Sequence, residues 1–313
     1  MNNCRVCNSF NSKKIKLKEF LYSTGDTFDY IHCQVCNSIC IKEIPLNLSK
    51  YYPQDYYSYK ISTAHIFSWK SLLRTRIILM SALFFKRKSV FNTNIDIPDY
   101  LFHIDGLTSK SKILDIGSGN GELLYSLHNN GFTKLTGIDP FINKTIFDQG
   151  IRIFKGHIDT LDEKFDLIIL NHVFEHVENP KELLNKLPKL LNRNGKIILR
   201  TPIVNKAFEI YGHNWIQLDP PRHLHIFGPD ILEKIINRAG LKVKKVIYDS
   251  TSFQFWGSEQ NILGIGLFSS KDSLAITSNS SFFSNAQLKT WEQEAEKLNK
   301  QSKGDQAIFI LSL

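Results

Sequence analysis

A glycine-rich turn is the first place in this sequence where residue types and spacing predict chemistry. The stretch KILDIGSGNGE, at residues 112–122, has the pattern of a short strand, a tight loop and the start of a helix. Glycines allow positive φ and a close approach of a ligand, and the free N–H groups of a helix start point toward it. The spacing is G-x-G-x-G, and Glu122 stands where the dinucleotide pattern G-x-G-x-x-G requires its third glycine. The loop therefore predicts a nucleotide-like ligand, with a purely structural glycine turn as the alternative.

Two acids accompany this loop. Asp115 lies two residues before Gly117, and KLTGID at residues 134–139 predicts a second strand that ends in Asp139. A carboxylate at that strand end can accept hydrogen bonds from both ribose hydroxyls. With both acids and the G-x-G-x-G loop, residues 111–313 resemble the class I S-adenosylmethionine-dependent methyltransferases.

The resemblance implies a fold and a cofactor. The implied fold is α/β and Rossmann-like, with a doubly wound, seven-stranded, mostly parallel sheet, and the implied cofactor is S-adenosylmethionine. In that family the first acid and the glycine loop hold the amino acid and ribose of the cofactor, and the second acid holds the ribose. The implied cofactor contacts are Asp115, Gly117, Ser118, Gly119, Gly121, Asp139, Asn171 and, near the adenine ring, His157 or Ile158.

The segment NHVFEH at residues 171–176 follows an apolar strand pattern at 165–170. On a helix, His172, Glu175 and His176 would share one face, where they could bind a metal or act as base and orienter. H-x-x-E-H is also the inverted zinc-protease pattern, but its place at a strand end near the proposed sulfonium argues against a protease. Three alternatives stay open: Glu175 and His176 shape the pocket, one of them is an acid or base, or they bind a divalent ion.

A second polar cluster follows the fifth predicted strand, at residues 196–199. It comprises YGHNW at 211–215 and DPPRHLHIF at 219–227, and its prolines predict a rigid loop above the same sheet edge. Methyl transfer to a hydroxyl needs a base, and histidine has an unperturbed pKa of ~6.5. We therefore predict His223 as the base, with Glu175, His176 and Tyr211 completing the catalytic set, against the alternative of a histidine without a role. The W…P-R-H-L-x-x-F string resembles methyltransferases found with sugar and polysaccharide biosynthesis.

The cysteines predict a metal site. All five lie within the first 40 residues, and Cys4, Cys7, Cys33 and Cys36 form two C-x-x-C pairs. Two such knuckles give tetrahedral coordination by four thiolates, which suits a structural Zn²⁺ better than a redox disulfide. Cys40 is left over as a buried or edge thiol. The predicted organisation is a zinc ribbon at 1–45, an aromatic and helical connector at 46–110 and the methyltransferase domain at 111–313.

Composition sets limits on partners and location. The net charge of +9 and the pI of about 9.1 favour anionic partners without choosing among them. The sequence contains no apolar run of the ~20 residues that span a bilayer and no signal-peptide pattern, so we expect a cytoplasmic protein. The predicted helix at 71–88 has basic ends and an apolar centre. It could lie on a membrane surface, although we favour a helix that covers the pocket or packs on a partner.

These observations predict methyl transfer from S-adenosylmethionine to a small hydroxylated acceptor. The expected acceptor is a sugar or a nucleotide-linked sugar of surface polysaccharide biosynthesis, methylated on oxygen or carbon. One alternative is an RNA methyltransferase, which a zinc ribbon and a basic charge would suit, although we do not expect a nucleic acid partner. The other is a non-catalytic binding or scaffold module with a degenerate cofactor site.

Overall fold

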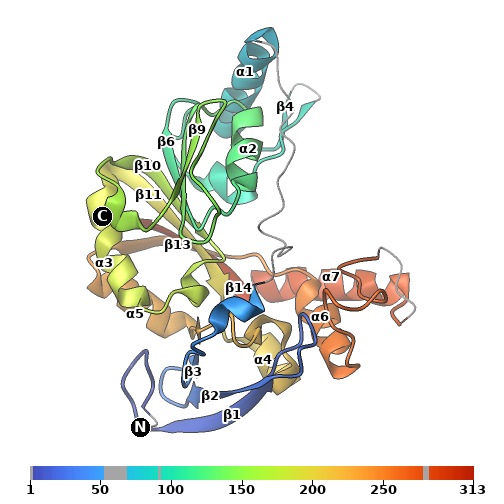
Figure 1. Cartoon of the computed structure of the whole chain (residues 1–313). Helices are drawn as coiled ribbons and strands as arrows, with labels where there is room; N and C mark the ends of the chain where they lie inside the picture. The colour runs from blue at the N-terminus through green and yellow to red at the C-terminus, as the bar shows by residue number, and fades with distance from the viewer. Residues whose placement is uncertain (1–2, 53–68, 91–92, 278–281) are drawn as a thin grey trace.

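The computed structural model describes residues 3–52, 69–90, 93–277 and 282–313. Of residues 69–74, 89–90 and 93–94 it describes the backbone alone. Its centre is an eight-stranded mixed sheet in the order β13-β14-β11-β10-β6-β7-β9-β8 (Figure 1). The strands are β6 (Lys112–Ile116), β7 (Lys134–Asp139), β8 (Ile146–Asp148), β9 (Ile151–Lys155), β10 (Phe165–Asn171), β11 (Leu191–Pro202), β13 (Lys242–Tyr248) and β14 (Gln306–Ser312).

Most of this sheet is parallel, as the sequence predicts, but it has one strand more than expected. Strand β14 runs antiparallel between β11 and β13, and the short β8 is antiparallel to β9. The extra strand β8 arises because Gln149 and Gly150, with φ of 49° and 83°, form a two-residue hairpin turn before Ile151. Two consecutive residues with positive φ are the signature of a tight hairpin turn. The Rossmann-like α/β fold is confirmed, and the predicted count of seven strands is corrected to eight in the described part of the chain.

Helices cover both faces of the sheet because successive side chains of a buried strand point to opposite faces. Leu114 packs in one core with α3 (Pro180–Leu190) and α5 (Pro229–Arg238). Ile113 packs in the other core with α1 (Trp69–Phe85) and α2 (Glu122–Asn129). The helix predicted at 71–88 corresponds to α1, and the strand predicted at 134–139 is β7.

The cysteine-containing segment forms a second, four-stranded sheet, β1-β2-β3-β12. Its first three strands, at the N-terminal end of the chain, are β1 (Ser12–Lys18), β2 (Thr27–Cys33) and β3 (Ile39–Ile41), and the fourth is β12 (His225–Ile226). Strand β12 belongs to the segment that follows β11, and it pairs His225 with Cys40. In Figure 1 the blue strands β1, β2 and β3 lie beside α4 (Lys206–Tyr211), at the opposite end of the molecule from α1. The N-terminal segment and the chain around His223 are therefore joined through one sheet.

The remaining elements lie at several places around the two sheets, with β4 (Ser89–Val90) beside α1 (Figure 1). They are α6 (Phe253–Ile262), α7 (Asn285–Lys300), the small β4 and β5 (Thr93–Asn94), and the 3₁₀ turns Leu48–Tyr51, Asp99–His103, Ile158–Thr160, Phe174–His176, Gly212–Asn214 and Ile216–Leu218. Among the described residues, no helix combines the length and the apolar character needed to cross a membrane.

Candidate active site and metal centre

The glycine loop connects β6 to α2 and has the predicted conformation. Gly117, Gly119 and Gly121 have φ of 70°, 51° and 88°, and Gly121 directly precedes α2. A Cβ at Gly117 would collide with the side chain of Val173, which comes from the loop after β10. The glycines are therefore required both by backbone conformation and by the close approach of a neighbouring loop.

Asp115 and Asp139 lie at the ends of two adjacent strands and are both buried. The carboxylate of Asp139 accepts hydrogen bonds from the N–H groups of Gly119, at 3.0 Å, and Phe141, at 2.7 Å. Burial and the charge of Asp139 raise the pKa of Asp115 to about 8. A cationic ligand bound beside the two acids would therefore stabilise the ionised form of Asp115.

The remaining predicted cofactor residues lie around this pair. In the same loop Ser118 has a buried Oγ without a hydrogen-bond partner among the described residues, a group that a bound ligand can satisfy. Asn171 ends β10 and accepts a hydrogen bond from Arg200 at 3.1 Å. After β9, His157 is exposed and Ile158 is buried. These side chains can hold a nucleoside with an amino-acid group, and their individual contacts stay predictions.

A cavity of about 340 Å³ opens at the sheet edge formed by the ends of β10, β11 and β13 and the start of β14. Its polar lining includes His172, His176, His223, Asp219, Gln254 and Asp305, and its apolar lining includes Leu21, Phe253, Leu267 and Phe268. The two predicted histidine-containing segments therefore meet in one cavity, whose size is that of a small-molecule site.

Glu175 lies among three histidines, His172, His176 and His223. It is fully buried and accepts hydrogen bonds from Thr201, at 2.9 Å, and from Nδ1 of His172, at 3.1 Å. Burial alone would raise the pKa of Glu175, but the hydrogen bond and charge of His172, with the charges of the other histidines, lower it to about 2. The expected helix is only a single 3₁₀ turn, Phe174–His176, and His172 precedes it with φ of 54°. The turn still directs Glu175 and His172 toward each other.

His223 has one ring nitrogen fixed and one available. Its Nδ1 lies 2.7 Å from the carbonyl oxygen of Gln217, so Nδ1 carries the proton and donates it. Its Nε2 lies 4.0 Å from Glu175 Oε1 and 3.9 Å from Asp219 Oδ2, too far for a hydrogen bond. In the neutral ring, Nε2 therefore carries the lone pair that a general base needs.

His176 stands beside this base, with the two rings 4.7 Å apart. Its Nδ1 donates to the carbonyl oxygen of Arg222 at 2.9 Å, and burial and the charge of His223 lower the pKa of His176 to about 4. One ligand atom each of Glu175, His176 and His223 lie within 4.8 Å of one another. Two imidazoles and a carboxylate are ligand types that can hold a divalent cation, and the metal alternative stays a prediction.

Tyr211 lies apart from this cluster. It is in α4, its hydroxyl donates to Glu259 at 3.1 Å, and it is not among the residues that line the cavity. Its predicted catalytic role stays a prediction, and its observed contact joins α4 to α6.

Residues outside the two predicted histidine-containing segments support the His223 loop. Arg222 is fully buried and donates to Asp219, to the carboxylate of Glu19 at 2.7 Å and to the carbonyl oxygen of Tyr51 at 3.1 Å. Tyr30 donates to the carbonyl oxygen of His223 at 2.9 Å. The signal that the sequence offered was the aromatic content of the predicted connector at 46–110. Tyr51 belongs to this connector, and its aromatic residues from 56 to 69 lie outside the described side chains.

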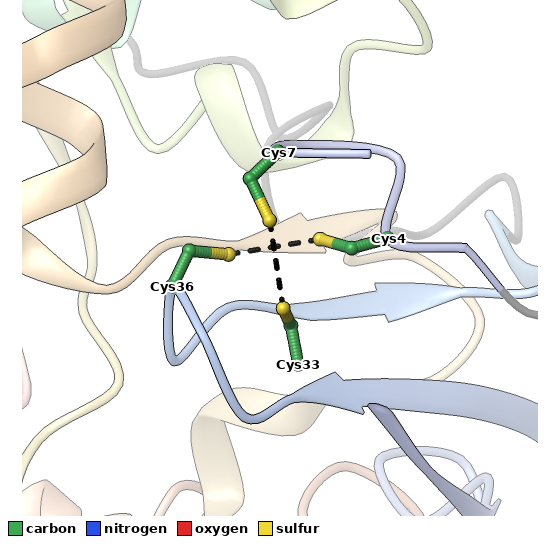
Figure 2. Close-up of side chains that lie close together, drawn as sticks. All are labelled: Cys4, Cys7, Cys33 and Cys36. Carbon is green, nitrogen blue, oxygen red and sulfur yellow. Dashed lines mark hydrogen bonds between the residues drawn. The ribbon is translucent and has the colours of Figure 1, made fainter. Parts of the chain in front are cut away.

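The four predicted metal ligands converge on one point (Figure 2). Sγ of Cys4 lies 3.6 Å from Sγ of Cys36, and Sγ of Cys7 lies 3.6 Å from Sγ of Cys33. Tetrahedral zinc with Zn–S bonds of ~2.3 Å requires sulfur separations of about 3.8 Å, so this arrangement fits a zinc ion. Cys40 is buried outside the cluster. The four cysteines therefore form a closed group that could bind a metal and leaves no position for a substrate.

Comparisons with known proteins agree with this fold and loop. The methyltransferase domain family matches residues 87–246. The chain is 24% identical over 179 residues to a mitochondrial ubiquinone biosynthesis O-methyltransferase of Dictyostelium discoideum, covering 45% of this chain and 54% of that protein. It is 29% identical over 163 residues to the mitochondrial enzyme of the same name from Arabidopsis thaliana, covering 43% and 48%.

A third relative acts on a different kind of molecule. The chain is 32% identical over 120 residues to a tRNA U34 carboxymethyltransferase of Sulfurimonas denitrificans, covering 35% of this chain and 38% of that protein. The chain thus spans about half or less of the length of these relatives. Since the family match extends over half of the sequence, this chain belongs to the methyltransferase domain family. The predicted class I S-adenosylmethionine-dependent methyltransferase domain is confirmed, whereas the resemblance to sugar methyltransferases stays a prediction.

Proposed function

We propose that this protein transfers a methyl group from S-adenosylmethionine to a hydroxyl group of a small polar acceptor. The observation that carries the proposal is His223, whose Nε2 faces Glu175 in a cavity lined by residues from the ends of β10, β11 and β13. Val173 links this cavity to the donor loop, because it lies between His172 and Glu175 and packs against Gly117.

Adenosylmethionine supplies, when bound, a methyl group activated by its sulfonium. Asp139 would hold the ribose, and the glycine loop and Asp115 would hold the amino-acid part. The protein must then place the acceptor oxygen in line with the methyl carbon and exclude water. As the new O–C bond forms and the C–S bond breaks, Nε2 of His223 accepts the hydroxyl proton. Gln217 fixes the tautomer of His223 that allows this, and the carboxylate of Glu175 stabilises the imidazolium that results.

The acceptor class is a narrower proposal. A sugar or nucleotide-linked sugar suits the polar lining of Gln254 and Asp305. A phenolic ring is the second candidate, because two of the relatives are named as ubiquinone biosynthesis O-methyltransferases and because Phe253 and Phe268 line the same cavity. RNA is the alternative to a small acceptor, supported by the tRNA-modifying relative and the basic charge.

We also propose that Cys4, Cys7, Cys33 and Cys36 bind a structural Zn²⁺. The support is their sulfur spacing and their position in the core that contains Phe227 and the helix α5. With four protein ligands the ion would have no open coordination position, so its role would be to hold β1–β3 against the rest of the fold.

Mass spectrometry with methyl-labelled adenosylmethionine tests the proposal. Nucleotide sugars, catechol-type phenols and RNA are offered separately, and transfer is detected as the mass shift of the acceptor. We expect one class to be labelled, and we expect His223→Ala to lose about 10²-fold or more of the rate. An adenosylmethionine-induced rise in melting temperature that survives in His223→Ala shows that the donor site is intact. No such rise in the wild-type protein would favour the non-catalytic scaffold.

A further inference from the structure

The helix α1 has an exposed apolar face that its own fold does not use. Ile78, Leu79 and Ala82 are buried in the core shared with α2. On the other side, Ile77 is 56% exposed, Met80 38% and Phe84 80%, and the adjacent Phe85 is 51% exposed. Positions 77, 80 and 84 are spaced i, i+3 and i+7, so these three side chains form one stripe along the helix.

Exposed basic residues lie at the C-terminal end of this stripe. Residues 69–88 contain six lysines and arginines and no acid, out of a net charge of +9 for the whole chain. Lys86, Arg87 and Lys88 follow the helix directly and are exposed. Lys86 pairs with Asp105 and Lys88 with Asp99, but all four side chains of these pairs are about half exposed or more, and such pairs contribute little. The basic end of α1 therefore remains attractive to anions.

The position of α1 favours binding to a broad surface of a partner over binding in a narrow cleft. In Figure 1 the helix projects at one end of the molecule, opposite the N-terminal sheet. None of its described side chains lines the cavity, which differs from the expectation that this helix covers the pocket. A projecting apolar stripe next to exposed cations matches the interfacial region of an anionic bilayer, where phenylalanine enters the acyl boundary and lysine and arginine meet the headgroups.

We propose that α1 docks this protein onto an anionic membrane surface through Ile77, Met80, Phe84 and Phe85, with Lys86, Arg87 and Lys88 contacting lipid headgroups. The helix lies in the interface and does not cross the bilayer. This proposal is independent of the methyl-transfer chemistry, because it uses no residue of the cavity or the glycine loop.

Vesicle sedimentation tests the proposal. The full-length protein is mixed with vesicles of phosphatidylcholine alone or of phosphatidylcholine and phosphatidylglycerol in equal amounts. We expect binding to the anionic vesicles to be at least about tenfold tighter and to weaken as salt is added. The double variant Ile77→Asp with Phe84→Asp should lose binding, and Lys86→Glu with Arg87→Glu should lose the preference for phosphatidylglycerol.

Matched controls separate the helix from general effects. Phe10 is 75% exposed on the N-terminal segment, and Phe10→Asp should bind vesicles like the wild type. Lys14→Glu with Lys16→Glu, two exposed positions on β1, changes the net charge by the same amount as the α1 charge variant and should retain the preference. All variants should keep the wild-type melting temperature. Equal binding to both vesicle types, or no binding, overturns the proposal. So does a wild-type dimer that Phe84→Asp dissociates, since the face would then belong to a second copy.

Discussion

Arg222 and Glu19 form an ion pair in which Nη2 and Oε1 lie 2.7 Å apart, although 203 residues separate them in the sequence and both side chains are fully buried. The pair joins the N-terminal sheet to the loop that carries His223. Burial lowers and the two carboxylates raise the pKa of Arg222, with a net rise, so the guanidinium stays charged. The guanidinium therefore has two buried carboxylate partners, Glu19 and Asp219.

Glu19→Gln should destabilise the protein by about 3 kcal/mol, because it leaves a buried cation with one partner fewer. Urea unfolding measures the loss. Glu43→Gln is the matched control, since Glu43 is 85% exposed and pairs with Lys42 at 3.7 Å, and it should cost less than about 0.5 kcal/mol. Similar small losses in both variants would show that the buried pair contributes no more than a surface pair.

Removal of the proposed zinc ion should loosen the His223 loop as well as the N-terminal sheet. Cys33→Ser should abolish zinc binding and lower the free energy of unfolding by roughly 3 kcal/mol or more, since the closed four-thiolate site is lost. Elemental analysis and thermal unfolding check both effects. Cys40→Ser changes a buried thiol outside the cluster and should keep one zinc ion per chain. Retention of zinc by Cys33→Ser would contradict the assignment.

Binding of adenosylmethionine should tighten as the pH rises from about 6 to about 8. The pKa of Asp115 is raised to about 8 by burial and Asp139, so Asp115 is mostly protonated below this value, whereas a cationic ligand favours the carboxylate. Calorimetry in buffers of different ionisation enthalpy should detect proton release on binding. Asp115→Asn should remove the pH dependence, and a wild-type affinity that is flat over this range would rule the linkage out.

The raised pKa of Asp115 also predicts how the stability of the ligand-free protein depends on pH. The pKa of Asp115 lies above its ordinary value of 3.8, so its contribution to stability is complete below that value and is lost as the pH rises from 3.8 through about 8. Thermal unfolding near pH 9 should therefore show Asp115→Asn gaining stability relative to the wild type, compared with measurements near pH 5. A constant difference across this range would contradict the buried-acid description.

Gly117→Ala should remove cofactor binding, because the added methyl group would collide with Val173 and the residue has φ of 70°. Gly150→Ala is a matched control with φ of 83° and nothing within 4 Å of the added carbon. Both variants bear the cost of positive φ, about 1–2 kcal/mol, but only Gly117→Ala should lose the adenosylmethionine-induced rise in melting temperature. A normal rise in Gly117→Ala would show that the glycine is not needed for binding.

The sequence predicted features that depend on neighbouring residues. The strand–loop–helix pattern around Gly117, the strand that ends in Asp139 and the cysteine cluster all follow from local spacing, and the structure contains each of them. The approach of His223 to Glu175 was also predictable, because both segments follow strands whose carboxyl ends share one sheet edge. These are short-range or topological arguments, and they need no knowledge of individual long-range contacts.

Contacts between residues far apart in the chain could not be predicted from the sequence. Nothing in the spacing of residues 19 and 222 indicates that they meet, and β12, with two residues, is too short to leave a periodic pattern. The turn at Gln149 and Gly150 was missed because it is not one of the usual Asn-Gly or Asp-Gly hairpin pairs. Likewise, the single 3₁₀ turn at Phe174–His176 depends on packing against β11 and β12 rather than on helical propensity.

The sheet shared by β3 and β12 cannot be completed until the ribosome has synthesised both strands. Roughly 180 residues separate Ile41 from His225, so at about 5–20 residues per second the ribosome needs roughly 10–40 s to deliver the partner of β3. During that interval the outer edge of β3 is open to strands of other nascent chains, which is the usual route to aggregation. Translation speed and chaperone access between these two strands should therefore determine how much protein is recovered in soluble form.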